Sequence, residues 1–220
     1  MPQEIKKRII TSFFLLILLC LMYFYSFILI ISLIIIGIIV WIEFYALMSK
    51  IFYAETFNSK LLLFFVKTVS LIYIVFLVYI ICIAEVQNSD LKLQIFFAIT
   101  IAIASDIGGL IVGSLIKGKK LTKISPKKTI SGSIGSFFFS SLCVPFFTDI
   151  FTAYNLLTLI LVTLVISLVT QIGDLFISLV KRKAHVKDTS DLLPGHGGFL
   201  DRVDGIIFAI PFSLFLFYLI

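Results

Sequence analysis

The sequence has few charged residues, few acids and few cysteines. Only 14% of its 220 residues are charged, 12 of them acidic, whereas 60% are hydrophobic. Soluble domains carry about a quarter charged residues, so this composition excludes a water-soluble globular enzyme. The three cysteines, Cys20, Cys82 and Cys143, lie inside apolar runs without metal-ligand spacing, which argues against a disulfide framework or a cysteine-bound metal.

Long apolar runs make up most of the chain. About 20 apolar residues cross a bilayer, and in lipid a helix satisfies its own backbone hydrogen bonds. We therefore expect an all-α, polytopic transmembrane helical bundle. About seven spans are predicted, near residues 9–25, 27–47, 62–84, 94–116, 133–149, 155–180 and 204–220. Residues 1–93 would form N-terminal transmembrane helices, and 94–220 a catalytic transmembrane region with cytoplasmic loops 117–132 and 181–203.

The 18 lysines and arginines are unevenly placed along these spans. With the N-terminus inside, nearly all of them fall in cytoplasmic segments, and only Lys92 lies in an outer loop. This is the asymmetry that the positive-inside rule describes, so we predict that the N-terminus is inside and the C-terminus outside. Topology thus explains the net charge of +6, and no nucleic-acid partner is expected.

The first cytoplasmic loop is rich in lysine. Residues 117–135 read KGKKLTKISPKKTISGSIG, with six lysines among the first twelve positions. The lysines alone are explained by contact with anionic lipid headgroups. Pro126, however, predicts a turn, and the hydroxyls, lysines and glycines at the start of the next helix suit a phosphate. Both interpretations stay open.

A polar stripe runs along the expected span 155–180. At 100° per residue its members fall within an arc of about 120°, namely Thr163, Ser167, Thr170, Gln171, Asp174, Ser178, Lys181 and Arg182. Such a stripe must face other helices or a water-filled cavity. Asp174 lies about two turns inside the helix, where a carboxylate needs a cation beside it. The alternative to a functional role is a structural ion pair with Lys181 or a neighbouring helix.

Asp106 lies on a helix face that also carries Gly109 and Gly113. These glycines would let another helix approach closely and bring Asp106 into the same cavity, although simple helix packing explains them nearly as well. Glu43 and Glu85 lie near predicted span ends and call for no special role.

The second cytoplasmic loop concentrates charge. Residues 178–204, SLVKRKAHVKDTSDLLPGHGGFLDRVD, contain four acids, five bases and two histidines. The paired glycines let the backbone approach a ligand closely, whereas the alternative is a hydrated loop with incidental charges. Asp174 and Asp201, with Asp204 nearby, suit Mg²⁺, which prefers oxygen ligands and shares them with substrate phosphates. Surrounding bases would neutralise further phosphate oxygens, as phosphoryl or nucleotidyl transfer requires.

The same residues carry a family resemblance. The stretch contains Ser178, Lys181-Arg182, Lys187-Asp188, Ser190, Leu193-Pro194, His196-Gly197-Gly198 and Asp201-Arg202-Val203-Asp204. Together they resemble the C-terminal signature of the phosphatidate cytidylyltransferase (CDP-diacylglycerol synthase) family. Residues 125–129, Ser-Pro-Lys-Lys-Thr, resemble another motif of that family. Two departures are Ser131, where the family usually has Glu, and Gly109-Leu110, where Ala-Tyr is common.

The resemblance implies that a phosphate oxygen of phosphatidic acid attacks the α-phosphorus of CTP. CDP-diacylglycerol and pyrophosphate are then released. It implies that Asp174 and Asp201 bind the metal ions, Mg²⁺ and a second cation, and act in catalysis with Lys128 and His196. The substrate-binding residues that we expect are Ser125, Lys127, Thr129, Ser178, Lys181, Arg182, Lys187, Asp188, Gly197, Gly198, Arg202, Asp204 and Asp106.

Two other functions compete with this one. A CTP-dependent kinase of a lipid alcohol would release CDP instead of pyrophosphate. A cation-coupled membrane transporter would use Asp106 and Asp174 as a relay. The leading hypothesis predicts an integral membrane protein of a bacterial inner membrane, with its active site on the cytoplasmic side. Its partners would be CTP, phosphatidic acid and membrane lipid, with a homodimer as the assembly to test.

Overall fold

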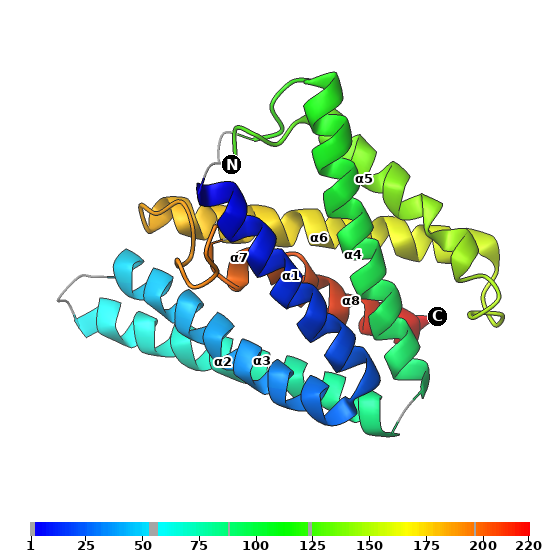
Figure 1. Ribbon diagram of the computed structural model, residues 1–220, viewed down its shortest axis with the longest axis horizontal. Coiled ribbons are helices and arrows are strands. Elements are labelled where there is room, and N and C mark those ends of the chain that lie inside the picture. The colour runs from blue at the N-terminus through cyan, green and yellow to red at the C-terminus, as the bar shows by residue number, and fades with distance from the viewer. Residues whose placement is uncertain (1–2, 53–56, 88, 123–124, 196) are drawn as a thin grey trace. The chain divides into compact units, whose positions relative to one another are not determined.

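The computed structural model describes residues 3–52, 57–87, 89–122, 125–195 and 197–220 (Figure 1). Within these ranges the regular structure is helical, and the only β-type pairings are isolated bridges from Lys120 to Thr129 and from Leu193 to Gly197. The helices are α1 (Gln3–Phe24), α2 (Ser26–Ile51), α3 (Phe57–Gln87), α4 (Ser89–Ile116), α5 (Ile130–Leu142), the 3₁₀ turn η1 (Val144–Phe146), α6 (Leu156–Lys183), α7 (Leu200–Val203) and α8 (Ile206–Leu219). The predicted all-α class is confirmed.

Five segments of the described chain are long and apolar enough to cross a membrane. They are Ser26–Ile51, Phe57–Val86, Asp90–Ile116, Leu156–Lys183 and Leu200–Leu219. The other two expected spans correspond to shorter apolar helices, Phe13–Met22 and Ile130–Phe146. The protein is therefore a polytopic helical membrane protein, but two of the seven predicted spans are shorter than the roughly 20 residues that a crossing needs.

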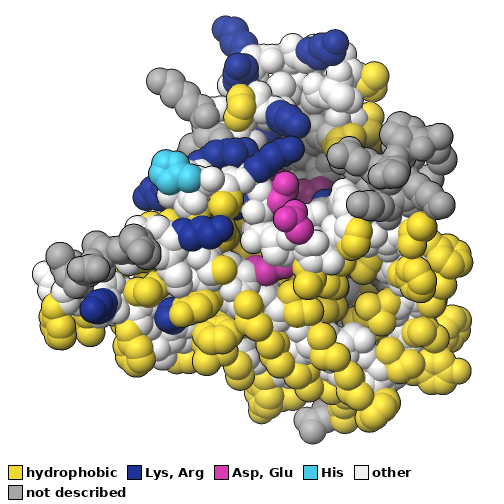
Figure 2. All heavy atoms as spheres, turned by 60° about the vertical axis from the view of Figure 1, so that its left-hand side comes forward, with side chains coloured by type: hydrophobic (Ala, Val, Ile, Leu, Met, Phe, Trp, Pro, Cys, Tyr) yellow, Lys and Arg dark blue, Asp and Glu magenta, His cyan; other side chains and the backbone are white. Residues whose placement is uncertain are grey.

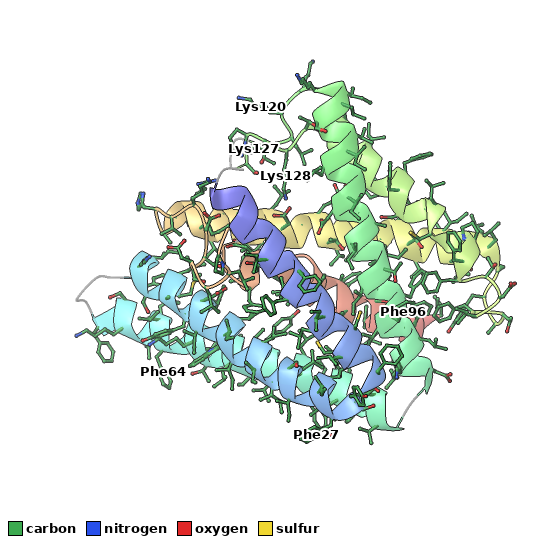
Figure 3. All side chains as sticks on the ribbon, viewed as in Figure 1. Phe27, Phe64, Phe96, Lys120, Lys127 and Lys128 are labelled. Carbon is green, nitrogen blue, oxygen red and sulfur yellow. The ribbon has the colours of Figure 1, made fainter. Side chains whose placement is uncertain are left out.

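Large apolar side chains cover much of the surface, as lipid contact requires (Figure 2). Phe27 on α2, Phe64 on α3 and Phe96 on α4 are 74%, 68% and 55% exposed (Figure 3). A water-soluble protein rarely exposes apolar patches of this extent. These surfaces therefore agree with a protein whose solvent is lipid.

The chain forms two compact units, and the division into N-terminal helices and a catalytic region at residue 93 stays a prediction. One unit comprises residues 1–88 and 180–203, and the other residues 89–179 and 204–220. The charged segment 181–203, which carries most of the C-terminal signature, thus groups with the N-terminal helices, whereas Asp174 and the motif at residues 125–129 lie in the other unit. In this first unit α2 and α3 pack closely at Gly37, where a Cβ would lie 2.9 Å from Val78 Cγ2.

The second unit is built around an aromatic core. Phe97 of α4 packs edge-on against Phe147, Phe151 and Phe217. Phe97 is fully buried, and the two rings of Phe151 and Phe217 stack with their centroids 5.1 Å apart. This core joins α4 to α8 and to the segment that follows η1, and Leu159, Val162 and Ile166 of α6 belong to the same buried cluster.

Helices α4 and α5 approach each other through glycines. A Cβ on Gly108 would lie 2.5 Å from the Gly135 carbonyl oxygen, and one on Gly109 would lie 2.7 Å from Ser136 Oγ. Gly113 similarly faces Gly132. Small residues let helix backbones come close in lipid, where packing replaces the hydrophobic drive. The predicted close approach at Gly109 and Gly113 is confirmed.

The polar stripe of α6 faces protein in the second unit. Thr163, Ser167 and Thr170 are fully buried. The hydroxyl of Ser167 lies 2.9 Å from that of Ser105, and Ser136 donates a hydrogen bond of 2.7 Å to the Ser105 carbonyl oxygen. These contacts join α4, α5 and α6, and they confirm that the stripe points toward other helices and not toward lipid.

Candidate active site

The lysine-rich loop is a tight hairpin that ends at the start of α5. Lys128 donates its backbone N–H to the Ser125 carbonyl oxygen at 3.0 Å, which closes a turn with Pro126 at its second position. Leu121 donates to the Lys128 carbonyl oxygen at 2.8 Å, and Ile130 donates to that of Lys119 at 2.9 Å. The turn predicted at Pro126 is confirmed, and the hairpin fixes the backbone on both sides of Lys128 (Figure 3).

Lys128 and Asp174 form an ion pair in the second unit. Their side chains are 25% and 29% exposed. Ser178, one turn further along α6, donates to Asp174 Oδ1 at 3.4 Å. Asp106 is close enough to interact electrostatically with both Asp174 and Lys128. The cation expected beside Asp174 is therefore supplied by the preceding loop and not by Lys181.

Two of the three neighbouring residues expected to bind substrate have structural roles in the loop. Thr129 is the N-cap of α5, and its side chain accepts the Gly132 N–H at 3.0 Å. Its hydroxyl also lies 3.0 Å from Ser131 Oγ. Ser125 contributes its carbonyl oxygen to the turn, and Lys127 is exposed. Of the expected substrate contacts in this loop, Thr129 is thus already engaged with the backbone of Gly132.

The end of α6 reverses the chain through a left-handed residue. His185 has a φ of 57°, the conformation that usually follows a helix C-terminus. Val186 donates to the Lys181 carbonyl oxygen at 3.0 Å, and His185 donates to that of Arg182 at 3.1 Å. Arg182 also donates to the Val186 carbonyl oxygen at 3.4 Å. The side chain of Arg182, expected to bind substrate, here contacts the turn that follows the helix.

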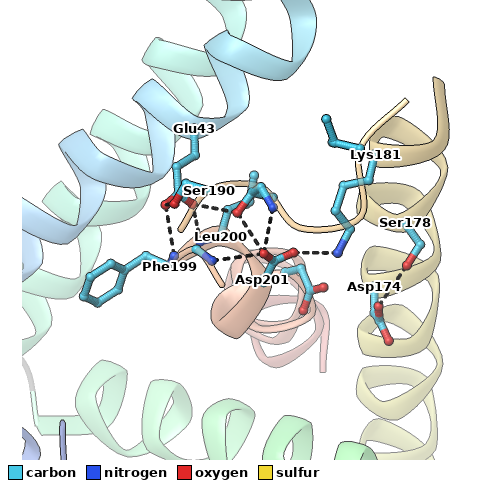
Figure 4. Close-up of polar contacts among 12 residues, drawn as sticks. Glu43, Asp174, Ser178, Lys181, Ser190, Phe199, Leu200 and Asp201 are labelled. Atoms are coloured by element: carbon cyan, nitrogen blue, oxygen red, sulfur yellow. Dashed lines mark hydrogen bonds and ion pairs between the residues drawn. The ribbon is translucent and has the colours of Figure 1, made fainter. Parts of the chain in front are cut away.

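Lys181 reaches the second carboxylate of the signature, in the first unit. Its Nζ donates to Asp201 Oδ1 at 2.5 Å, and the two side chains are 12% and 8% exposed. The other oxygen, Oδ2, accepts N–H groups from Thr189 at 2.8 Å and from Gly198 at 3.1 Å (Figure 4). A carboxylate held by two amides and an ammonium has one well-defined orientation.

The expectation that Glu43 needs no special role near a span end is wrong. It is 5% exposed and accepts four hydrogen bonds from residues in 189–200 (Figure 4). The donors are Ser190 Oγ at 2.6 Å, Leu200 N at 2.8 Å, Thr189 Oγ1 at 3.0 Å and Phe199 N at 3.1 Å. Its one sequence signal is an acid inside an apolar run, and its partners are about 150 residues away.

The paired glycines face carboxylates of the protein itself. Gly197 has a φ of 83°, and a Cβ there would lie 3.0 Å from Asp201 Oδ2. A Cβ on Gly198 would lie 2.0 Å from Thr189 Oγ1 and 2.6 Å from Glu43 Oε2. The prediction that the backbone of these glycines closely approaches another group is confirmed. The groups that it approaches are the side chains of Asp201 and Glu43, so neither glycine needs a ligand to explain it.

The remaining predicted residues differ in their exposure. Lys187, Asp188 and Arg202 are exposed. Asp204 is 9% exposed, and its Oδ1 accepts the Gly205 N–H at 3.0 Å. His196 lies outside the described residues, so its predicted role stays a prediction. Asp174 and Asp201 belong to different units, and their sharing of a metal likewise stays a prediction.

The donor chemistry of the two aspartates fits Mg²⁺. Both offer carboxylate oxygens, the ligands that this ion prefers, and each carboxylate already holds a cation in the form of a lysine ammonium. In the described part of the chain no three His, Cys, Asp or Glu side chains gather as a metal site. A bound Mg²⁺ would therefore complete its coordination with water and substrate phosphates, which is its usual behaviour.

Fold and site together define a polytopic membrane protein with two carboxylate–lysine pairs, a residue set suited to phosphate groups and a divalent cation. The model of the cytidylyltransferase family matches residues 2–220, so the chain belongs to that family.

Curated relatives agree with this assignment. The phosphatidate cytidylyltransferase of Staphylococcus aureus is 44% identical over 120 residues, 53% of this chain and 46% of the relative. That of Staphylococcus saprophyticus is 42% identical over 120 residues, again 53% and 46%. That of Bacillus subtilis is 38% identical over 136 residues, 60% of this chain and 51% of the relative. The matches thus span about half the length of these relatives.

Proposed function

We propose that this protein transfers CMP from CTP to phosphatidic acid, giving CDP-diacylglycerol and pyrophosphate for phospholipid synthesis. The observation that carries the proposal is the pairing of each expected metal-binding aspartate with a lysine, Lys128 with Asp174 and Lys181 with Asp201. Family membership and the activity for which the relatives are named support the same reaction. The integral membrane fold suits a lipid substrate.

In the proposed reaction an oxygen of the phosphatidic acid phosphate forms a bond to the α-phosphorus of CTP. The bond from that phosphorus to the oxygen bridging to the β-phosphorus breaks, and pyrophosphate leaves with its electron pair. The attacking oxygen is already anionic, so no strong general base is required. Lys128 and Lys181 would bind phosphate oxygens, because an ammonium is a natural partner for phosphate.

Asp174 and Asp201 are the residues that would hold Mg²⁺ and a second cation. When bound, such ions neutralise phosphate charge and orient the reacting groups. The residues of the chain then have distinct tasks. The aspartates hold positive charge at the site, and their lysines change partner from carboxylate to phosphate as substrate enters. Ser178 orients Asp174 through its hydrogen bond of 3.4 Å.

We place the reaction at the cytoplasmic side of a bacterial inner membrane. The relatives named above are bacterial, and CTP is a soluble cytoplasmic substrate. The lysine-rich loop at residues 117–129 and the charged loop at 181–203 would both face that compartment under the positive-inside rule. A homodimer remains an assembly to test.

The test uses purified protein in lipid, CTP labelled on the α-phosphate, Mg²⁺ and phosphatidic acid. We expect the label to appear in the lipid product together with unlabelled pyrophosphate. A lipid-alcohol kinase would instead leave the label in CDP, and a transporter would leave CTP intact. Either of those two outcomes in several lipid compositions would overturn the proposal.

Variants at the two aspartates complete the experiment. Asp174→Asn and Asp201→Asn should each lower kcat/KM by about 100-fold or more, because each removes a charge that phosphate binding needs in place. Asp149→Asn is a matched control, since Asp149 is an exposed aspartate between η1 and α6. Equal activity in all three variants would contradict the roles given to Asp174 and Asp201.

A further inference from the structure

Glu43 lies inside α2, in a segment apolar enough to span a membrane, yet its carboxylate is 5% exposed. Burying a carboxylate costs several kcal/mol unless hydrogen bonds replace the lost water. All four of the donors described above are uncharged groups of residues 189–200. In these four contacts the carboxylate therefore accepts hydrogen bonds from neutral groups of the loop and does not form an ion pair with them.

The donors come from both ends of that segment. Thr189 and Ser190 lie at its start, and Phe199 and Leu200 lie at its end, where α7 begins. Between them Leu193 and Gly197 exchange two backbone hydrogen bonds of 2.8 and 3.1 Å. The carboxylate of Glu43 thus binds both ends of the 189–200 loop and holds them at one position on α2.

The same loop orients Asp201. Thr189 Oγ1 lies 3.0 Å from Glu43 Oε2 and 3.0 Å from Asp201 Oδ2. A hydroxyl has one hydrogen, so it donates to one carboxylate at a time. The backbone N–H groups of Thr189 and Gly198 hold Asp201 whichever way that hydroxyl turns. Gly198 fits between Thr189 and Glu43 only because it lacks a side chain.

We propose that Glu43 is a positioning residue for Asp201. Its carboxylate is the point on which the 189–200 loop closes, and the closed loop presents the Asp201 carboxylate in one orientation. The N-terminal helices, which carry none of the signature, therefore supply a necessary part of the site. What Asp201 then binds rests on the proposed function, whereas the closure of the loop does not.

Three variants separate this role from a general one in folding. Glu43→Gln replaces an acceptor with an NH₂ group that faces other donors, so at least one of the four contacts must break. Glu43→Asp keeps both acceptor oxygens on a shorter stem. Glu85→Gln is the control, because Glu85 is also a glutamate of a spanning helix, and it accepts a hydrogen bond from Ser26 in an exposed contact.

The first measurement is amide hydrogen exchange in detergent without substrates. Glu43→Gln should raise exchange of the backbone N–H groups of residues 189–201 by about tenfold or more, since each loses protection when the loop opens. Glu43→Asp should give a smaller increase, and Glu85→Gln none. Exchange in this segment that is equal for Glu43→Gln and Glu85→Gln would overturn the proposal.

The second measurement is the Mg²⁺ concentration for half-maximal cytidylyl transfer. Loss of a supporting contact to a metal ligand weakens metal binding by about 10- to 100-fold, so Glu43→Gln should raise this concentration within that range while the KM for phosphatidic acid stays unchanged. A general folding defect would reduce the amount of active protein without moving the Mg²⁺ requirement, and that result would also contradict the proposal.

A further variant covers the case in which Glu43→Gln does not fold. Thr189→Val removes the hydroxyl between the two carboxylates and leaves Glu43 in place, so it should shift loop exchange and the Mg²⁺ requirement in the same direction by a smaller factor. Unchanged values in this variant would then count against the proposal. If the wild type proves inactive but loop exchange responds as expected, the proposed function fails while the loop closure by Glu43 stands.

Discussion

Lys181 Nζ lies 2.5 Å from Asp201 Oδ1, in a pair whose side chains are 12% and 8% exposed. The lysine belongs to the last turns of α6 and the aspartate to α7, so the pair fixes the charged loop between them. Lys128 and Asp174 repeat the arrangement in the other unit. In both pairs an ammonium lies against the carboxylate that is expected to hold a metal ion.

Lys128→Met should strengthen metal binding and weaken catalysis. Without substrate the ammonium competes with a divalent cation for Asp174, so its removal should tighten Mn²⁺ binding measured by paramagnetic resonance. The phosphate partner is lost at the same time, which should lower kcat/KM by about 10- to 100-fold. Lys120→Met, in an exposed position of the same loop, is the control. Weaker Mn²⁺ binding in Lys128→Met than in wild type would rule out this competition.

Lys181→Met should destabilise the protein. It leaves the Asp201 carboxylate buried without its cation, and breaking a buried pair from one side costs about 3 to 5 kcal/mol. Thermal unfolding in detergent should show a clear drop in midpoint. Lys181→Arg retains the charge and should recover most of the loss. A midpoint equal to wild type in Lys181→Met would show that the pair contributes nothing to stability.

The contact between α4 and α5 predicts a graded response to added methyl groups. A Cβ on Gly135 would lie 2.4 Å from Val112 Cβ and 2.7 Å from the Gly108 carbonyl oxygen. Gly135→Ala should therefore separate the helices and cost about 1 to 3 kcal/mol. Gly113→Ala should cost less, since its nearest neighbour, Thr129 Oγ1, would lie 3.1 Å away. Unfolding midpoints measured side by side test the order, and the reverse order would contradict it.

His185→Gly should preserve both stability and activity. His185 has a φ of 57°, and this conformation costs a residue with a side chain roughly 1 to 2 kcal/mol. Glycine relieves that cost but loses more backbone freedom on folding, so stability should be unchanged or rise by up to about 1 kcal/mol. His185→Val should be clearly less stable than wild type, because branched residues tolerate this region poorly. Lost activity in a stable His185→Gly protein would indicate a chemical role for the imidazole.

Much of the fold follows from local sequence. Helical periodicity places Thr163, Ser167 and Thr170 on one face, and these residues are fully buried against other helices. Gly109 and Gly113 mark the close contact with α5 for the same reason, since spacing along a helix determines which residues share a face. The ends of the helices and the lengths of the two short apolar helices, Phe13–Met22 and Ile130–Phe146, were less predictable. These lengths depend on packing as much as on composition.

The site was predictable in its residue types but less so in its contacts. Asp174 and Asp201 stand out as acids in an apolar chain, and the signature around them indicates phosphate chemistry. Their lysine partners could not be assigned, because Lys128 and Lys181 were two among many nearby bases. Glu43 was missed since its donors are 146 to 157 residues away, and no local pattern records such a contact.

By itself the sequence determined a helical membrane protein and the family signature, because apolar length, charge asymmetry and motif spacing are properties of short segments. Only the tertiary structure decided that Lys128 binds Asp174, that Lys181 binds Asp201 and that Glu43 closes the loop around Asp201. Those choices depend on which buried donors and acceptors the packed helices bring within hydrogen-bonding distance. A buried charge must find its partner there, wherever in the chain that partner lies.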